Sequence, residues 1–362
     1  MSFGFRTFRG DSALRRILAH PGLGLEHYQS GTSGVSVLVT PAGATTAVDV
    51  RGGGPGTRET DLLAPHNTVE QVHAIVLSGG SAFGLATADG VARHLADQGI
   101  GFAPSPNHPE VQVPIVPAAV IFDLLVGQLD KPDAAVGAAA AKEALQRVSN
   151  CALDDDNALR SGCVGAGVAA QAGAIKGGVG HAVVDLPGKQ YAGQWVAAVV
   201  VANPVGAVLG ETGHVIGDSS LPAITEDNRQ TLLESSLGMT KLSSLNTTIG
   251  CLITNVALPV SQLQRLAMSG HDGLARAVYP AHTPLDGDTL FALSVPDPAA
   301  YVANDDAASA AQDPAVQDPA VQDPAALAML SVAAADAVQH AVVDAVVSAE
   351  SAFGLAAYKD LC

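Results

Sequence analysis

The stretch "SSLNTTIGCLITNVAL", residues 243–258, joins two kinds of sequence without a spacer. Its second half, from Ile249 onward, is a run of apolar and β-branched residues that predicts a buried strand. Its first half contains small polar side chains, among them Asn246, Thr247 and Thr248, and a single leucine. Ser, Asn and Thr bond their own backbone, so the polar half alone is typical of a turn. The strand is the clearer prediction, and the polar half has to be interpreted from the rest of the chain.

Around this stretch, apolar runs with β-strand patterns alternate with helical periodicity. The run at 72–99, "VHAIVLSGGSAFGLATADGVARHLADQG", predicts a strand, a Gly-Gly turn and a helix from about residue 83 to 95. The same reading predicts strands at 34–41, 45–50, 113–125, 194–209 and 289–295, and helices at 133–148 and 259–278. No strict βα period emerges, which indicates an α/β protein with helices packed on more than one sheet face.

Two segments are predicted to lie outside the core. Residues 210–245 hold few β-formers and many turn residues, and predict an exposed loop or linker ahead of Asn246. Residues 311–326, "AQDPAVQDPAVQDPAA", contain tandem copies of Gln-Asp-Pro-Ala, so residues 303–326 are predicted to form a low-complexity surface loop. An Ala/Val-rich helix is predicted over 327–349.

Composition excludes several classes of function. Eighteen basic and 35 acidic residues give a net charge of −17, which disfavours nucleic acid and anionic lipid as partners. The start "MSFGFRTFRGDSALRR" lacks the apolar core of a signal peptide, and no window is interpreted as a membrane span, which predicts a cytoplasmic protein. The four cysteines and eleven histidines form no metal-ligand motif, so neither a metal nor another cofactor is predicted.

Several motifs resemble catalytic signatures only in part. "LSGGSAFGL" has the strand, turn and helix context of a nucleophile elbow at Ser81, but it is not G-x-S-x-G. A serine hydrolase using Ser81 therefore stays open as an alternative. "RGGGPGTRET" lacks the G-K-[ST] ending of a phosphate loop and is interpreted as a structural turn. His271 and His282, near Asp272 and Asp286, are interpreted as satisfied polar residues.

The Asn246-Thr247 pair permits a more specific chemistry. A threonine hydroxyl becomes an effective nucleophile beside a base, and its own α-amino group is the nearest base once the preceding peptide bond is cut. That amine has a reference pKa of about 7.7 to 8.0, close to working pH. Self-cleavage would proceed by attack of the Thr247 hydroxyl on the Asn246 carbonyl, followed by hydrolysis of the ester. A polar segment before the cut and a rigid strand after it suit this reaction.

The stretch "NTTIGCLITNVAL" and the later "SGHDGLARAVYPAHTPLDGDTLFALS" together resemble a known family. It is the family of self-processing amidases that includes the nylon-oligomer (6-aminohexanoate oligomer) hydrolases, the D-aminopeptidases and the β-peptidyl aminopeptidases. "VDVRGGGPGTRETDLL", "VLSGGSAFGLATADGV", "IKGGVG" and "AAYKDL" extend the resemblance over nearly the whole chain. The resemblance implies a single four-layer αββα sandwich of the N-terminal-nucleophile-hydrolase type. It also implies cleavage into a large chain, 1–246, and a small chain, 247–362.

The resemblance also implies roles for five residues. Thr247 matches the new N-terminal nucleophile, and Asn203 in "VVVANPVG" matches the asparagine that faces the developing oxyanion. Lys176 in "AIKGGVG" matches a lysine beside the nucleophile that tunes its protonation. Asp286 and Asp288 in "LDGDT" match an acidic pair behind the nucleophile, which orients the α-ammonium group and assists proton transfer.

Threonine combined with Asp-Gly-Asp is more similar to the nylon-oligomer hydrolases than to the aminopeptidase branch. We therefore expect endo-type cleavage of nylon oligomers or similar linear aliphatic amides. An aminopeptidase of the same fold, acting on D-amino-acid or β-peptidyl substrates, is the first alternative. A non-catalytic binding protein, in which Asn246-Thr247 is only a turn, is another. The resemblance further implies a homo-oligomer, a tetramer of processed heterodimers.

Overall fold

The computed structural model describes residues 4–150, 159–238, 246–296 and 323–362. Its strands are β1 (Arg6–Arg9), β2 (Gly24–Ser30), β3 (Ser33–Val50), β4 (Thr57–Arg58), β5 (Gln71–Ser78), β6 (Ala118–Val120), β7 (Gln171–Ala172), β8 (Ile175–Lys176), β9 (Gly178–Asp185), β10 (Trp195–Ala202), β11 (Ile249–Thr254) and β12 (Thr289–Ser294). Its α-helices are α1 (Asp11–Leu18), α2 (Thr87–Asp97), α3 (Ala134–Asn150), α4 (Glu226–Gly238), α5 (Val260–Ala277), α8 (Pro324–Val347) and α9 (Tyr358–Leu361).

One hydrogen-bonded path runs through almost all the strands, in the order β1-β9-β10-β11-β12-β3-β5-β6-β4. The long strand β3 connects its two halves. The amino-terminal part of β3 pairs with β2 and β5, and its carboxyl-terminal part pairs with β12. A register shift between Val39 and Ala44 marks the place where β3 passes from one half to the other. The two halves therefore form two packed layers of sheet.

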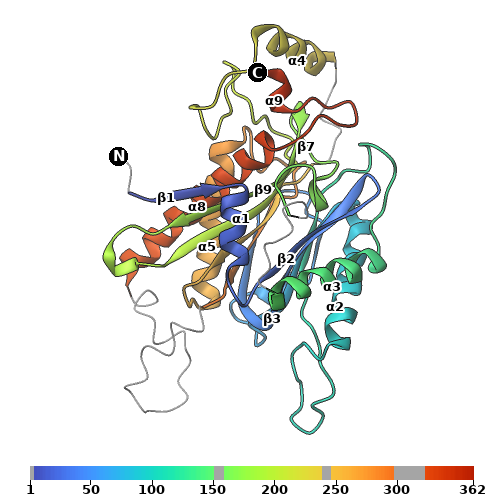
Figure 1. Ribbon diagram of the computed structural model, residues 1–362, viewed down its shortest axis with the longest axis vertical. Coiled ribbons are helices and arrows are strands. Elements are labelled where there is room, and N and C mark those ends of the chain that lie inside the picture. Colours follow the sequence, from blue (N-terminus) through green and yellow to red (C-terminus); the bar gives the residue numbers. More distant parts are fainter. Residues whose placement is uncertain (1–3, 151–158, 239–245, 297–322) are drawn as a thin grey trace.

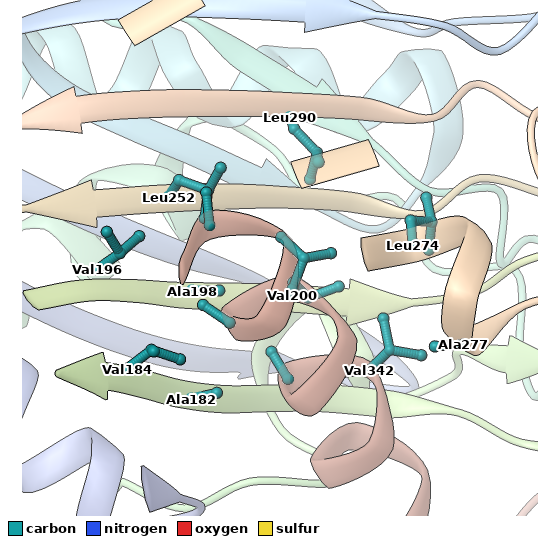
Figure 2. Packing of buried hydrophobic residues seen from close by; sticks show 14 of the residues in the cluster. Ala182, Val184, Val196, Ala198, Val200, Leu252, Leu274, Ala277, Leu290 and Val342 are labelled. Atoms are coloured by element: carbon teal, nitrogen blue, oxygen red, sulfur yellow. The ribbon is translucent and has the colours of Figure 1, made fainter. Parts of the chain in front are cut away.

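Strands β9 to β12 are buried on both faces, so their side chains alternate between two cores. One core lies between these strands and the helices α5 and α8. Figure 2 shows its side chains from the strands, such as Val200 and Leu252, against Leu274 of α5 and Val342 of α8. The residues between them in sequence, such as Val199 and Cys251, point into a second core.

The second core lies between the two sheet layers. Phe291 of β12 and Ile253 of β11 meet Leu38 of β3 and Ile75 of β5 there, with α1 packed beside them. A third core lies on the outer face of β3 and β5, where Val35 and the neighbouring strand residues pack against α2 and α3 (Figure 1). The order helix, sheet, sheet, helix is the four-layer αββα sandwich that the family resemblance implied.

Several predicted elements needed correction. Pro41 and Gly43 suggested two strands, but 34–41 and 45–50 belong to the single strand β3. The strand expected at 113–125 is only β6, with one isolated bridge at Val113. Within 210–245, residues 226–238 form the helix α4 rather than a loop. Acidic side chains at its start, Glu226 and Asp227, suit the helix dipole there.

The low-complexity segment lies mostly outside the described residues, at 297–322. Its last residues, 323–326, are not loop, because α8 begins at Pro324 with the Asp323 side chain accepting a hydrogen bond from the Ala325 amide at 2.9 Å. Proline is tolerated in the first turn of a helix, where its missing N–H has no partner to lose. Pro324, the last proline of the repeat, is therefore the first residue of the long helix and not part of a linker.

Helix α8 also corrects the prediction that no segment is long and apolar enough to span a membrane. Its length and composition meet that criterion, with a mean hydropathy of 1.5. In the fold, however, its apolar residues, such as Leu330 and Val338, are buried against α5, β9 and β10. Helix α8 is a core helix here, and a long buried helix has the same composition as a membrane span.

Candidate active site

Strand directions bring the predicted site residues to one edge of the sheet. Strand β10 is antiparallel to both β9 and β11, so its last residues lie beside the first residues of those two strands. Strand β12 is parallel to β11, and therefore also begins at this edge. Lys176 comes just before β9, Asn203 just after β10, Thr247 just before β11, and Asp288 just before β12. Residues far apart in the sequence thus converge through sheet register alone.

Asn246 and Thr247 extend β11 by a short stretch beside residues 286–288. An isolated parallel bridge joins Asn246 to Asp286. The Thr247 hydroxyl lies 2.6 Å from the Asn246 carbonyl oxygen, and donates a hydrogen bond to it. The Gly287 amide donates to the same oxygen at 3.2 Å. Both residues are almost closed to solvent, with exposed fractions of 8% for Asn246 and 4% for Thr247. The uncut chain therefore holds hydroxyl, carbonyl and an amide donor together in a buried place.

Asn203 lies against Thr247 through its backbone. Its carbonyl accepts the Thr247 amide at 2.8 Å. Its side-chain oxygen accepts the Gln171 amide at 2.9 Å, and its side-chain nitrogen is 3.4 Å from the Phe122 carbonyl. If the peptide bond before Thr247 is cut, the freed amine can keep its bond to the Asn203 carbonyl. The oxyanion role of the Asn203 side chain stays a prediction.

Asp286 and Asp288 lie beside Asn246 and Thr248. Asp286 accepts hydrogen bonds from the Val205 amide and from the amide and hydroxyl of Thr283, at 3.0, 3.0 and 2.6 Å. Burial raises the pKa of Asp286 and the charge of Asp288 adds to this, while the bonds from Thr283 and Val205 oppose it. Asp288 accepts the Thr248 amide at 2.8 Å. The pair fixes the backbone around Thr247.

Lys176 is fully buried, with no exposed surface. Its Nζ donates to the carbonyls of Gly167, Ala170 and Gly177 at 3.2, 2.9 and 2.9 Å. Three carbonyl acceptors use all three N–H bonds of an ammonium group. Burial lowers the pKa of Lys176, and the neighbouring Cys163 and Asp123 oppose that shift. In the described chain Lys176 makes no hydrogen bond to Thr247, so its tuning role stays a prediction.

Two features of this edge were missed by sequence reasoning. The Gly287 amide, which donates to the Asn246 carbonyl, gives no signal of its own because every residue has an amide. His282 bonds Asp288 through Nδ1 at 2.8 Å, although it had been interpreted only as a satisfied polar residue. Its position six residues before Asp288, in a turn rich in proline and glycine, was the one signal available.

We predict that Gly287→Ala prevents formation of the site. A Cβ atom at Gly287 would lie 2.9 Å from the Thr247 hydroxyl oxygen and 2.7 Å from the Gly54 carbonyl oxygen. Both distances are too short, so the backbone of residue 54 or of residue 287 would have to shift. Displacing a reacting group by even 1 Å costs about 100-fold in rate, so we expect any self-cleavage at residue 246 to slow by at least about that factor. Intact-protein mass measured over time checks this. Gly210→Ala is the control, because its Cβ would meet nothing closer than 3.8 Å, and it should be cut normally.

The glycine-rich turn "RGGGPG" packs against the acidic pair, which confirms its structural interpretation. The Gly54 amide donates to the Asp286 carbonyl at 2.8 Å, and a Cβ at Gly52 would lie 2.3 Å from that same oxygen. Ser81, in contrast, has a left-handed backbone with φ of 53°. Among the described residues, no histidine or carboxylate bonds its hydroxyl. The same described ranges contain no cluster of three or more His, Cys, Asp or Glu side chains that would hold a metal.

Comparison with known proteins decides the family. A model of peptidase family S58 matches residues 20–359. The chain belongs to peptidase family S58. This S58 chain is 42% identical over 335 residues to an uncharacterized aminopeptidase of Mycobacterium leprae, covering 90% of the chain and 85% of that relative. It is 31% identical over 307 residues to a 6-aminohexanoate-oligomer endohydrolase of Agromyces, covering 79% of the chain and 76% of that relative.

Solved structures confirm the fold of the S58 chain. An L-aminopeptidase D-Ala-esterase/amidase from Ochrobactrum anthropi superposes with a TM-score of 0.61 at 18% identity, covering 93% of this chain and 87% of that one. That protein is described as a new variant among the Ntn-hydrolase fold. The αββα sandwich is therefore an N-terminal-nucleophile-hydrolase fold, and the S58 chain is a hydrolase of amide or peptide bonds.

Proposed function

We propose that this S58 hydrolase cuts itself between Asn246 and Thr247, and then uses Thr247 as its nucleophile on linear aliphatic amides. The observation that carries the proposal is the 2.6 Å contact between the Thr247 hydroxyl and the Asn246 carbonyl oxygen, with the Gly287 amide on the same oxygen. In the first step the hydroxyl oxygen attacks the Asn246 carbonyl carbon, and charge develops on the oxygen that Gly287 faces. The hydroxyl proton passes to the Thr247 nitrogen as the C–N bond breaks, which leaves the free amine and an ester. Water then hydrolyses the ester to the Asn246 carboxylate and the Thr247 hydroxyl.

After the cut, Thr247 carries both a hydroxyl and a free α-amine. The amine accepts the hydroxyl proton as Thr247 attacks the substrate carbonyl, and returns it to the leaving amine. Water then releases the acyl group from Thr247. Asn203 as oxyanion donor, Lys176 as tuning group, and Asp286 and Asp288 as orienting carboxylates complete the proposed site. No cofactor takes part in this proposal.

Endo-type cleavage of nylon-like oligoamides is the preferred activity, since the Agromyces relative is named as a 6-aminohexanoate-oligomer endohydrolase. An apolar cavity of about 150 Å³ lies between the β7–β8 hairpin and α4, and Gln171 of that hairpin bonds Asn203. That volume is smaller than a typical ligand site, so the cavity would take only a short segment of an apolar chain. Aminopeptidase action is the second candidate, because the Mycobacterium leprae relative is named as an aminopeptidase. A cytoplasmic tetramer of processed heterodimers remains part of the proposal.

The test compares two linear 6-aminohexanoate oligomers that differ only at the amino end. One has a free amine, and the other is blocked by an acetyl group. An endo-hydrolase cuts both at internal bonds, whereas an aminopeptidase cuts only the free oligomer and releases single units. We expect both oligomers to be cut by the processed protein, with products followed by mass spectrometry. Cleavage of the free oligomer alone would assign the aminopeptidase activity, and cleavage of neither would reject the proposed substrate class.

A further inference from the structure

His282 is connected to the candidate nucleophile through one carboxylate. Its ring Nδ1 and its backbone amide both bond Asp288 Oδ2, at 2.8 and 3.1 Å. The other oxygen of Asp288 accepts the Thr248 amide at 2.8 Å. Asp288 therefore links His282 to the residue that directly follows Thr247. Thr283, the next residue, holds Asp286 in the same two-bond manner.

The hydrogen-bond pattern places a proton on one ring nitrogen of this histidine. An ionised Asp288 only accepts hydrogen bonds, so the His282 Nδ1 must carry a proton. The other ring nitrogen, Nε2, is buried and has no partner in the described part of the chain. His271 packs edge-on against the ring at 4.8 Å between centroids, and donates its Nε2–H to the Asp49 carbonyl at 3.1 Å. Its Nδ1 is likewise buried without a partner among the described residues.

His282 therefore combines two unfavourable features. It has a φ of 57°, in the left-handed region that residues other than glycine adopt uncommonly, although histidine is among those enriched there. It also leaves a buried ring nitrogen unpaired, whereas nearly all buried polar atoms are paired. Such costs tend to persist where they hold a functional geometry in place. Here, the geometry in question is the position of the Asp288 carboxylate against the residues that precede β11.

We propose that His282 is a positioning residue for Thr247. By holding Asp288 it fixes the Thr248 amide, and so keeps the Thr247 hydroxyl against the Asn246 carbonyl in the uncut chain. In the cut chain, the same clamp fixes the backbone that carries the nucleophile. The inference rests on the proposed function of Thr247, and adds to it a residue that touches neither substrate nor nucleophile.

Three substitutions at this position test the proposal. Asparagine places an amide N–H where Nδ1 stands and tolerates a positive φ. Glutamine places its amide near Nε2, and alanine removes the donor. We expect His282→Ala and His282→Gln to slow both self-cleavage and kcat by about 10- to 100-fold, the effect of losing one charge-assisted hydrogen bond, with KM changed by less than about twofold. His282→Asn should recover rates within about threefold of wild type.

His73→Ala is the matched control, because His73 is also buried and its Nδ1 accepts the Ile115 amide at 3.2 Å elsewhere in the fold. It should leave both rates unchanged. Wild type is measured in the same series, so that a failure of the proposed function of Thr247 can be distinguished from a failure of the proposed role of His282. A wild type that is never cut at residue 246 overturns the function of Thr247. A cut wild type with His282→Ala or His282→Gln at the wild-type rate overturns the role of His282. If the alanine variant does not fold, equal rates in the asparagine and glutamine variants overturn it.

Discussion

Thr247→Ala is expected to remain a single chain of 362 residues and to lose amidase activity by at least about 10,000-fold, as is typical when a covalent nucleophile is removed. The reason is geometric. The Thr247 hydroxyl is the one that lies 2.6 Å from the Asn246 carbonyl oxygen. The neighbouring Thr248 hydroxyl is buried and without a partner in the described structure, and it makes no contact with that carbonyl. It should not substitute. Thr247→Ser keeps the hydroxyl, and should still be cut, within about tenfold of the wild-type rate.

Intact-protein mass spectrometry of freshly purified and aged samples measures this directly. Wild type should give two chains, one ending at Asn246 and one beginning at Thr247. Ser81→Ala is the control, since a serine hydrolase would lose its activity through that change instead. A Thr247→Ala protein that is still cut at residue 246, or that keeps wild-type activity, would remove Thr247 from the mechanism. Loss of activity in Ser81→Ala alone would move the nucleophile to Ser81.

Much of the fold was predictable because period-two and helical patterns are local. The strand beginning at Ile249, the strand at 289–294 and the helix at 260–277 lie where their patterns placed them. The long strand β3 was not predictable, because Pro41 and Gly43 interrupt its pattern at the point where it changes sheet layer. Helix α4 was not predictable either, since its residues show almost no amphipathic period.

The candidate site also has a part that the sequence predicted and a part that it did not. The family resemblance implied Thr247, Asn203 and Asp288 as site residues, and sheet register explains why these three residues lie at the same edge. The roles of Gly287 and His282 depend on which atoms lie opposite them, and such contacts leave no local pattern. The same holds for a buried chain of hydrogen bonds that runs from β2 to α8. Its directly bonded side chains are separated by up to 183 residues, so no sequence motif connects them.

This buried chain predicts a strong acid dependence of stability. His27 Nε2 lies 3.0 Å from His181 Nε2, and His181 Nδ1 lies 2.9 Å from the Ser161 hydroxyl, which donates to Asp344. Asp344 also accepts the His181 amide at 2.9 Å. With Asp344 ionised, one consistent set of donors runs from His27 to the carboxylate, and both rings are neutral. Burial lowers the pKa of His181 from 6.5 to about 3, and lowers that of His27 well below 6.5.

The sign of the effect follows from these directions. A histidine whose folded pKa lies below its unfolded value binds its proton only in the unfolded chain at intermediate pH. The stability it gives is present above pH 6.5, and is lost as pH falls toward 3. Burial raises the pKa of Asp344, which acts in the opposite direction, so the effect of His181 must be measured as a difference between variants.

We expect His181→Gln to reduce by about one the number of protons that the chain takes up when it unfolds in this pH range. The difference in unfolding free energy between the parent chain and His181→Gln should shrink by about 1.4 kcal/mol for each pH unit between about 6 and 4. Urea unfolding of both proteins in a Thr247→Ala background gives this slope, because the uncut chain unfolds and refolds as one molecule. His108→Gln is the surface control, since that side chain is 67% exposed, and the difference should change far less with pH in this variant. A difference that stays constant with pH would mean that His181 carries a proton inside the folded chain, and that the hydrogen bonds from His27 to Asp344 hold a charged ring.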